Sequence, residues 1–381
     1  MTVLAEAQCV VIGGGIAGLS CAWYLARDGV DVVLVEAGDL GAQASGANAG
    51  SLHLQIQYPE FASYGEGWAR AYAPTLRFLA ASIEMWRDLS AALDEDLQVK
   101  LAGGLVVATT EAQMRLIEAK ARIEATVGVE TEILDRNALL AEAPYLSDIA
   151  IGGGFCRREG KANPLRTTPA IADAAERAGV RIYRDTSVTG IVRSATGYSL
   201  DTPRGALRAG RIVNAAGARA GDIARMLGLD IAIAGFPIQV TITEPVASFI
   251  PHLVYSAAGK LSLKQALNGG CVIGGGWPAR LRADGGPVTD PLSLAANMVV
   301  AAGVAPVIAQ ARALRSWTAW VNGTPDWRPI LGEVPGSPGA FLAIFPWVGF
   351  SAGPGTGRVI ADLVQDRPPR LPLKGVSTLY D

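Results

Sequence analysis

The chain has 381 residues, of which 50% are hydrophobic and 18% are charged. Its net charge of −2 gives no electrostatic sign of a nucleic-acid partner or of binding to an anionic membrane surface. No uninterrupted apolar run is long enough to span a membrane. We expect a soluble protein with two domains, because the chain is too long for one simple core.

The N-terminal residues lack a basic segment and lead straight into an apolar strand, so we expect no signal peptide and a cytoplasmic location. The four cysteines contain no C-x-x-C pair, which argues against a disulfide framework and against a self-contained iron–sulfur or zinc site. We therefore predict no metal in this chain.

The first predicted elements form a nucleotide-binding strand–helix–strand unit. An apolar strand over residues 9–12 ends at a glycine turn. Gly13 permits the tight turn, Gly15 lets the backbone approach a pyrophosphate, and Gly18 lets the next helix pack against the strand. Three glycines alone could also form an ordinary turn. Here a helix, a second strand and an acidic residue follow the glycines in the order that a nucleotide-binding unit requires.

A helix over 16–27 and a second strand over 32–35 complete this unit. The first N–H groups of the helix have no partner within it and point at the phosphates. Glu36 stands at the end of the second strand, where its carboxylate accepts hydrogen bonds from both ribose hydroxyls. We predict cofactor contacts from Gly13, Gly15, Ile16, Ala17, Gly18, Glu36 and Ala37.

The following loop, residues 38–50, is rich in small residues that let backbone amides crowd around a ligand. A plain linker is the alternative, but this loop directly follows the ribose-binding strand. We predict cofactor contacts from Ser45, Asn48, Ala49, Gly50 and Ser51.

The middle of the chain alternates helical and extended patterns. Its expected helices are 65–93, 111–126, 137–141, 164–178, 291–301 and 306–313, and its expected strands are 103–108, 152–155, 181–183, 188–193, 211–218, 237–243 and 272–276. The strand over 211–218 runs into a second glycine turn, where we predict cofactor contacts from Ala216 and Gly217. The chain thus returns to the nucleotide domain after leaving it.

Near the C-terminus, a glycine-rich motif precedes an expected helix over 359–364, so its amides and the positive helix end would face the ligand. The alternative is an N-terminal cap with proline in the first turn. We predict cofactor contacts from Gly353, Pro354, Gly355 and Thr356.

The expected fold is α/β (α+β), with a Rossmann-like dinucleotide-binding domain and a second, substrate-binding domain built on a mostly antiparallel sheet. We assign 1–85, 150–225 and 320–381 to the first domain, and 86–149 and 226–319 to the substrate domain. Neither domain is a contiguous block of sequence.

Together these motifs resemble the D-amino-acid-oxidase (DAO) superfamily of FAD-dependent amine oxidoreductases. The motifs are 13–18 with Glu36, 45–50, 213–218, and the C-terminal 323–332 and 349–357. Glycine-rich elements at both ends of the chain agree with an extended, permanently bound FAD rather than a dissociating NAD. No cysteine lies where some relatives tether the flavin, so we expect noncovalent FAD.

Within the superfamily, residues 49–55 and 322–327 are similar to the flavin subunits of opine oxidases or dehydrogenases. They are more loosely similar to those of hydrogen cyanide synthase and D-hydroxyproline dehydrogenase. The resemblance implies smaller partner subunits with iron–sulfur or further flavin or nucleotide sites.

Two departures from relatives matter. Val321 stands where glycine-oxidase-like members carry an arginine that clamps the substrate carboxylate, and Gly274 falls where monomeric sarcosine oxidase has a lysine linked to oxygen activation. These departures argue against an efficient stand-alone oxidase. Arg315 and Arg328 are candidates to replace the clamp, with surface salt bridges as the alternative.

Three residues are candidates for chemistry: His53, Lys264 and Gln265. His53 follows the flavin loop and either contacts flavin or substrate or is a packing histidine. One of Lys264 and Gln265 points into the pocket if their strand alternates, although a solvent-facing lysine is the default. We expect the other histidine, His252, to be exposed.

Three tryptophans flank the C-terminal motifs and either wall the flavin pocket or pack in the core; they are Trp320, Trp327 and Trp347.

The leading hypothesis is oxidation of a secondary amine acid, an opine or a D-imino acid, by hydride transfer to flavin, with hydrolysis of the imine and electrons passing to a partner. The alternatives are a stand-alone oxidase of D-amino acids, glycine or sarcosine that uses O₂, a flavoprotein that mainly scaffolds an assembly, and an NAD-dependent dehydrogenase.

Overall fold

The first sheet is built around the dinucleotide unit. In this computed structural model, which describes residues 2–380, its main path has the order β19-β20-β11-β1-β2-β8, and β10 and β9 extend from β11. These strands are β1 (Val3–Ile12), β2 (Val32–Val35), β8 (Arg181–Tyr183), β9 (Gly190–Ser194), β10 (Gly197–Thr202), β11 (Gly205–Asn214), β19 (Ile330–Glu333) and β20 (Ala340–Ile344).

Helices cover this sheet, so its central parallel strands are buried on both faces. Residues 9–12 of β1 and all of β2 are buried, as an apolar run without alternation predicts. The covering helices are α1 (Ile16–Arg27), α6 (Pro164–Arg177), α7 (Ala220–Met226) and α9 (Gly349–Val364).

The second sheet has the order β18-β12-β15-β14-β13-β4-β6-β5, and all neighbours are antiparallel except β13 and β4. Its strands are β4 (Gly104–Ala108), β5 (Glu132–Asp135), β6 (Gly152–Cys156), β12 (Ala234–Pro245), β13 (Leu253–Ser256), β14 (Ser262–Gln265), β15 (Gly270–Pro278) and β18 (Ala313–Gly323). Helices α4 (Glu111–Ala125), α5 (Arg136–Glu142) and α8 (Pro291–Val304) pack on it.

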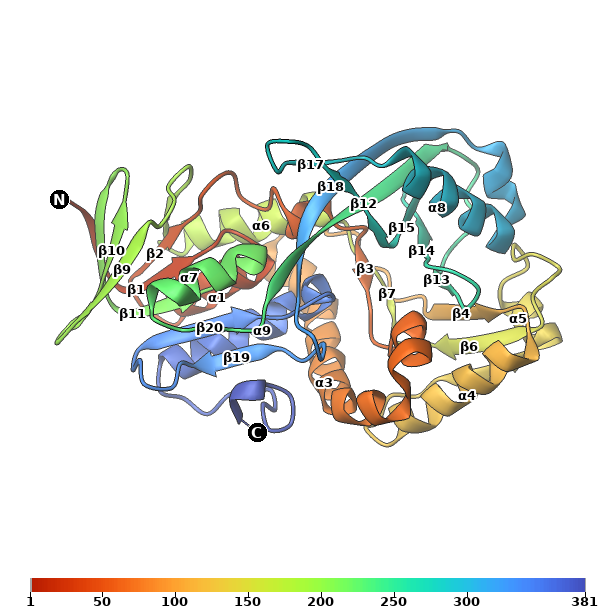
Figure 1. Cartoon of the computed structure of the whole chain (residues 1–381), viewed down its shortest axis with the longest axis horizontal. Helices are drawn as coiled ribbons and strands as arrows, with labels where there is room; N and C mark the ends of the chain where they lie inside the picture. Colours follow the sequence, from red (N-terminus) through yellow and green to blue (C-terminus); the bar gives the residue numbers. More distant parts are fainter. Residues whose placement is uncertain (1, 381) are drawn as a thin grey trace.

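Figure 1 shows the two sheets in two lobes, joined by the long strands β12 and β18 and by the helix α3 (Tyr58–Leu93). Short elements complete the chain: α2 (Ala44–Ala47), the β3–β7 pair (Ser51–Leu52 with Gly160–Lys161), the β16–β17 pair (Arg280–Leu281 with Pro287–Val288), and the 3-10 turns Gly217–Arg219, Pro306–Gln310 and Thr378–Tyr380. The expected combination of a Rossmann-like domain with a mostly antiparallel second sheet is confirmed.

Several segments differ from expectation. Strand β6 pairs with β4 and β5 in the second sheet, whereas the sequence pattern places residues from 150 onward in the FAD-binding domain. Its glycines allow close pairing, since a Cβ on Gly153 would lie 2.3 Å from the Val106 carbonyl oxygen. Helix α3 begins at Tyr58 and kinks at Gly65, whose φ is +74°. The expected helix 306–313 is only a 3-10 turn, because β18 already begins at Ala313.

Within residues 2–380, no helix combines the length and the apolar character needed to cross a membrane.

Candidate active site

The glycine turn between β1 and α1 has no room for side chains. Gly13 has φ +113°, and a Cβ there would lie 2.4 Å from the Ala215 carbonyl oxygen. A Cβ on Gly18 would lie 2.0 Å from the Gly13 carbonyl oxygen. The Ile16 amide donates to Ser45 Oγ at 2.9 Å, so the following loop closes over the start of α1. This cradle fits a dinucleotide, because Gly15, the residue before helix α1, has no side chain to cap the helix.

Glu36 ends β2 beside this turn. Its carboxylate accepts from the Gly14 amide at 2.6 Å and from the Gly38 amide at 2.9 Å. The adjoining Ala37 is exposed. Glu36 thus places an anionic acceptor at the carboxyl end of the parallel strands, which is where ligands bind in such sheets.

The small-residue loop is held in shape by Asn48. Its Nδ2 donates to the Ala44 and Ser45 carbonyl oxygens at 3.0 and 2.7 Å, and its Oδ1 accepts from the Gly50 amide at 2.6 Å. Asn48 and Ala49 line the cavity described below, as does Ser51 in β3.

The second glycine turn follows β11. The Ala216 amide donates to Asn214 Oδ1 at 3.2 Å, and Gly217 has φ +54°. Since Ala215 contacts Gly13, this turn lies against the first one.

The C-terminal glycine motif requires a correction, because it does not precede a helix. Helix α9 begins at Gly349, so Gly353, Pro354, Gly355 and Thr356 are buried inside it. The glycines of α9 let two other helices pack closely against it. A Cβ on Gly353 would lie 2.7 Å from Ile16 of α1, and a Cβ on Gly355 would lie 2.9 Å from Ser82 of α3. Pro354 is the sixth residue of α9, so it offers no N–H to the Phe350 carbonyl oxygen one turn earlier.

The start of α9 therefore takes the place that the motif was expected to occupy. Val348, Phe350 and Ser351, at its N-terminus, line the cavity. The unpaired N–H groups and the positive end of the helix dipole thus lie at the cavity wall. The Ser351 hydroxyl is already engaged, because it accepts from the His53 amide at 2.8 Å.

The cavity has a volume of about 480 Å³ and lies between the two sheets. Its wall combines small residues of the FAD-binding side, such as Ala49 and Ser51, with Gly274 of β15, whose added Cβ would lie 3.3 Å from Ala49 Cβ. Aromatic side chains close one side; Trp327 and Trp347 stack with centroids 4.9 Å apart, and Phe236 lies 4.7 Å beyond Trp347. The expected wall of tryptophans holds for these two, whereas Trp320 does not line the cavity.

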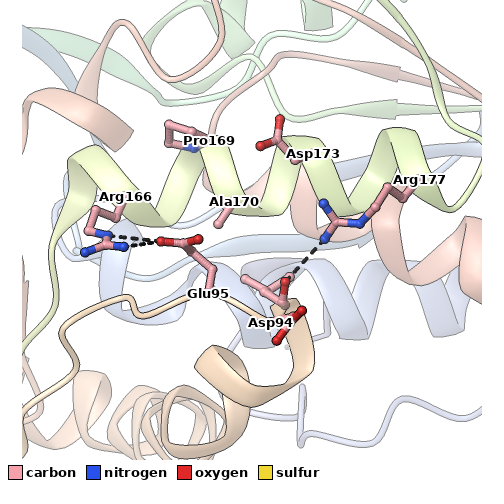
Figure 2. Close-up of a pocket in the computed structure, with 8 residues that line it drawn as sticks. Asp94, Glu95, Arg166, Pro169, Ala170, Asp173 and Arg177 are labelled. Atoms are coloured by element: carbon pink, nitrogen blue, oxygen red, sulfur yellow. Dashed lines mark hydrogen bonds and ion pairs between the residues drawn. The ribbon is translucent and has the colours of Figure 1, made fainter.

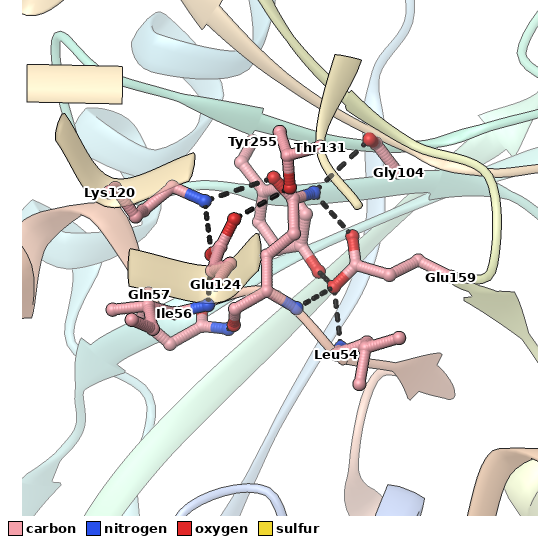
Figure 3. A network of polar contacts seen from close by, with 10 residues as sticks. Leu54, Ile56, Gln57, Gly104, Lys120, Glu124, Thr131, Glu159 and Tyr255 are labelled. Atoms are coloured by element: carbon pink, nitrogen blue, oxygen red, sulfur yellow. Dashed lines mark hydrogen bonds and ion pairs between the residues drawn. The ribbon is translucent and has the colours of Figure 1, made fainter. Parts of the chain in front are cut away.

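His53 lines this cavity and contacts Tyr255, which belongs to the buried polar network drawn in Figure 3. His53 Nδ1 lies 2.7 Å from the Tyr255 hydroxyl, which donates to Glu159 Oε1 at 3.0 Å. Burial, reinforced by Lys264, lowers the pKa of His53 to about 3. The imidazole is therefore neutral at physiological pH, and His53 both lines the cavity and packs by its hydrogen bond to Tyr255.

The far end of the network is a buried ion pair. Lys120 Nζ lies 2.6 Å from Glu124 Oε1, and both side chains are fully buried. Glu124 also accepts from the Ile56 amide at 2.7 Å and from the Thr131 hydroxyl at 2.6 Å. The network thus braces the segment between β3 and α3 that carries His53 (Figure 3).

Lys264 is buried, with 2% of its surface exposed, so the expectation of a solvent-facing lysine is wrong. Its Nζ bonds Ser262 Oγ at 3.3 Å, and Ser262 in turn lies 2.8 Å from Ser51 Oγ at the cavity wall. Burial, with Lys161 nearby, lowers the pKa of Lys264 to about 7. Lys264 therefore stands one side chain behind the cavity and changes charge near neutrality.

Gln265 does not reach the cavity, contrary to its prediction as a catalytic candidate. Its Oε1 accepts from the Phe249 and Ile250 amides at 2.8 and 3.1 Å, and its Nε2 donates to the Val246 and Ala247 carbonyl oxygens. It points to the opposite face from Lys264, as alternation requires. Gln265 therefore holds the loop at residues 246–250 in place.

His252 is buried rather than exposed. Its Nδ1 lies 2.8 Å from the Tyr145 hydroxyl and its Nε2 lies 3.1 Å from Glu142 Oε1. Both ring nitrogens are engaged away from the cavity, which makes His252 a structural histidine.

Arg315 and Arg328 do not line the cavity. Among the cavity-lining residues of the described chain, Lys260 is the sole lysine or arginine. It lies near Glu60, whose pKa is raised by burial and lowered by Lys260. Lys260, Tyr255 and Glu159 were missed from sequence, because none lies in a motif. Only the packing of distant strands brings Lys260 and Tyr255 to the cavity and places Glu159 behind Tyr255.

A second pocket, of about 190 Å³, lies between the end of α3 and α6 (Figure 2). Arg166 pairs with Glu95 across it, and Arg177 donates to the Leu93 carbonyl oxygen at 3.3 Å. Arg166 and Arg177 of this pocket therefore join α6 to the end of α3.

Comparison with known proteins identifies the family. The model of the DAO family, described as FAD dependent oxidoreductase, matches residues 8–363. An opine oxidase subunit of Rhizobium meliloti is 27% identical over 352 residues, covering 88% of each chain. The beta subunit of sarcosine oxidase of Rhizobium meliloti (strain 1021) is 25% identical over 366 residues, covering 93% of this chain and 83% of that one.

Glycine oxidase from Geobacillus kaustophilus has a similar crystal structure, with a TM-score of 0.85, 24% identity and 98% of both chains covered. The resemblance drawn from the motifs is thus confirmed, as is the FAD dependence that it implies. The chain belongs to the DAO family of FAD-dependent oxidoreductases.

Proposed function

We propose that this chain is the flavin subunit of an enzyme that oxidises the C–N bond of a secondary amine acid, an opine or a D-imino acid. The observation that carries this proposal is the cavity between the two sheets, which joins small residues of the FAD-binding side to a neutral histidine. Bound FAD supplies the hydride acceptor. The similarity to an opine oxidase subunit supports the substrate class.

The residues that would hold FAD noncovalently fall into three groups. The ADP half fits the turn at 13–18 with Glu36 and Ala37, and the loop 45–51 with the turn at Ala216 and Gly217 adjoins it. Trp347 Nε1, buried at the cavity wall without a hydrogen-bond partner in the described chain, fits a further polar ligand group. Of the C-terminal set, we propose that residues 348–351 contact the cofactor, while 353–356 support it by packing α9 against α1 and α3.

The chain's own residues suit an amine acid in two ways. His53 offers a neutral polar group at the cavity, and Lys260 offers a cation for the substrate carboxylate in place of an arginine. The stacked rings of Trp327 and Trp347 give one side of the cavity an aromatic wall. The imine formed by loss of hydride hydrolyses in water without further protein chemistry.

We further propose that electrons leave through a partner subunit. Two relatives are named as subunits, one of an opine oxidase and one of a sarcosine oxidase. Helix α8 also leaves apolar side chains in solvent, with Leu292 at 79% and Val299 at 70% exposure, which suits a protein contact.

The test uses the purified chain with FAD under anaerobic conditions. Mixing with a panel of opines, D-proline derivatives, sarcosine and glycine should bleach the flavin with a secondary amine acid, and a dye acceptor should sustain turnover. Admission of air should then reoxidise the flavin slowly. Rapid peroxide formation would instead support the stand-alone oxidase, which the likeness to glycine oxidase favours. Absence of bleaching with every amine would overturn the proposed substrate class.

A further inference from the structure

The ionisation state of Glu159 follows from its partners. Its Oε1 accepts from the Leu54 and Gln55 amides at 2.6 and 2.9 Å and from the Tyr255 hydroxyl at 3.0 Å. Its Oε2 lies 2.7 Å from Gln55 Nε2. A protonated carboxyl would direct its own hydrogen at one of these donors.

The orientation of the Gln55 side-chain amide is fixed independently. Its Oε1 faces Lys120 Nζ at 3.1 Å, which can only donate, and its Nε2 faces the Gly104 carbonyl oxygen at 3.2 Å, which can only accept. Gln55 Nε2 is therefore a true donor to Glu159. Burial raises the pKa of Glu159, and the hydrogen bonds from Leu54 and Gln55 lower it. Three N–H groups that can only donate, the Leu54 and Gln55 amides and Gln55 Nε2, occupy both carboxyl oxygens, and this geometry assigns Glu159 as a carboxylate.

This carboxylate sets the direction of the next two hydrogen bonds. The single proton of the Tyr255 hydroxyl is donated to Glu159, so the Tyr255 oxygen must accept from His53. The neutral imidazole then carries its proton on Nδ1, and Nε2 keeps a lone pair. Within residues 2–380 no hydrogen-bond partner occupies Nε2, and His53 lines the cavity.

We propose that Glu159 and Tyr255 are positioning residues that hold His53 in the Nδ1–H tautomer, so that Nε2 accepts the N–H of a secondary amine substrate. This inference rests on the proposed function. A neutral secondary amine has one N–H and one lone pair, and loss of hydride from the adjacent carbon requires that lone pair to be free. An accepting Nε2 binds the N–H and leaves the lone pair available, whereas the opposite tautomer would donate to it and block the reaction.

The chain provides a matched control, because it has only two histidines and each pairs Nδ1 with a tyrosine. Nitrogen NMR of the holoprotein, labelled with ¹⁵N-histidine, therefore shows two imidazoles, and His252→Asn assigns them. We expect His53 as the Nδ1–H tautomer in the wild type without substrate. Tyr255→Phe should return it to Nε2–H and leave His252 unchanged, while Tyr145→Phe should alter His252 alone.

Anaerobic stopped-flow reduction supplies the second readout. Tyr255→Phe should slow flavin reduction by a secondary amine acid at least tenfold, while Tyr145→Phe stays within twofold of wild type. An Nε2–H tautomer in the wild type, or slowed reduction in Tyr255→Phe with no change of tautomer, overturns the inference. If Tyr255→Phe fails to fold, the His53 tautomer measured in the wild-type protein still tests the inference. If the tautomer is as expected but no amine reduces wild-type flavin, the proposed function fails, and with it the role assigned to His53.

Discussion

The dinucleotide turn and the polar network beneath the cavity are built in opposite ways. The turn comes from one contiguous stretch, β1–α1–β2, in which each glycine has a local reason, such as the 2.0 Å approach at Gly18. The network joins the segment after β3, helix α4, strand β13 and the residue before β7 through buried charged groups. The difference teaches that chain-local geometry identifies the cofactor, whereas long-range pairing of buried polar groups shapes the substrate side.

The largest expected effect on stability comes from breaking the buried Lys120–Glu124 ion pair of the network. Lys120→Met leaves Glu124 charged and unpaired in a site that excludes water, and should lower the free energy of unfolding by about 3–5 kcal/mol. Urea denaturation of the holoprotein measures it. Arg70→Met removes an exposed pair with Glu66 of the same spacing and should cost less than about 0.5 kcal/mol. Equal costs for the two variants would show that the network carries no special stability.

The second prediction concerns pH. Since burial lowers the pKa of Lys264 from 10.5 to about 7 in the folded chain, the unfolded chain binds more protons between these values. Stability from this group therefore rises with pH across that window, by about 2 kcal/mol from pH 7 to pH 9. Lys264→Met should lack this rise when the two unfolding curves are compared. A constant difference between the proteins from pH 7 to pH 9 would mean that Lys264 does not titrate there.

The third prediction tests the turn. Gly18→Ala forces a methyl group against the Gly13 carbonyl oxygen, and should cost about 1–3 kcal/mol and yield protein without the yellow flavin absorbance. Gly67→Ala, in an open position on α3, should keep its FAD and gain up to about 1 kcal/mol. If Gly18→Ala retained FAD, the assignment of this turn to the cofactor site would be contradicted.

The same contrast explains what the sequence predicted. The helix over 16–27 and the strand over 32–35 match the structure residue for residue, because apolar period and glycine turns are local signals. The prediction that residues 353–357 precede a helix was wrong, because glycines occur where helices pack closely as well as where helices start. Tyr255 and Glu159 could not be predicted from local sequence, because only the pairing of β13 with β4 and of β3 with β7 brings them to His53.

The smallest expected effect lies at the cavity between the two regions. Lys260 is exposed and so contributes a partly screened charge, and Lys260→Met should raise KM for an amine acid about tenfold with kcat unchanged. Lys374→Met, an exposed lysine outside the cavity lining, should leave both constants unchanged. An amide of the same substrate, which lacks the carboxylate charge, should bind wild type and Lys260→Met alike. A fall in kcat rather than a rise in KM would assign Lys260 to the reacting centre, because an interaction that acts only in the transition state lowers kcat.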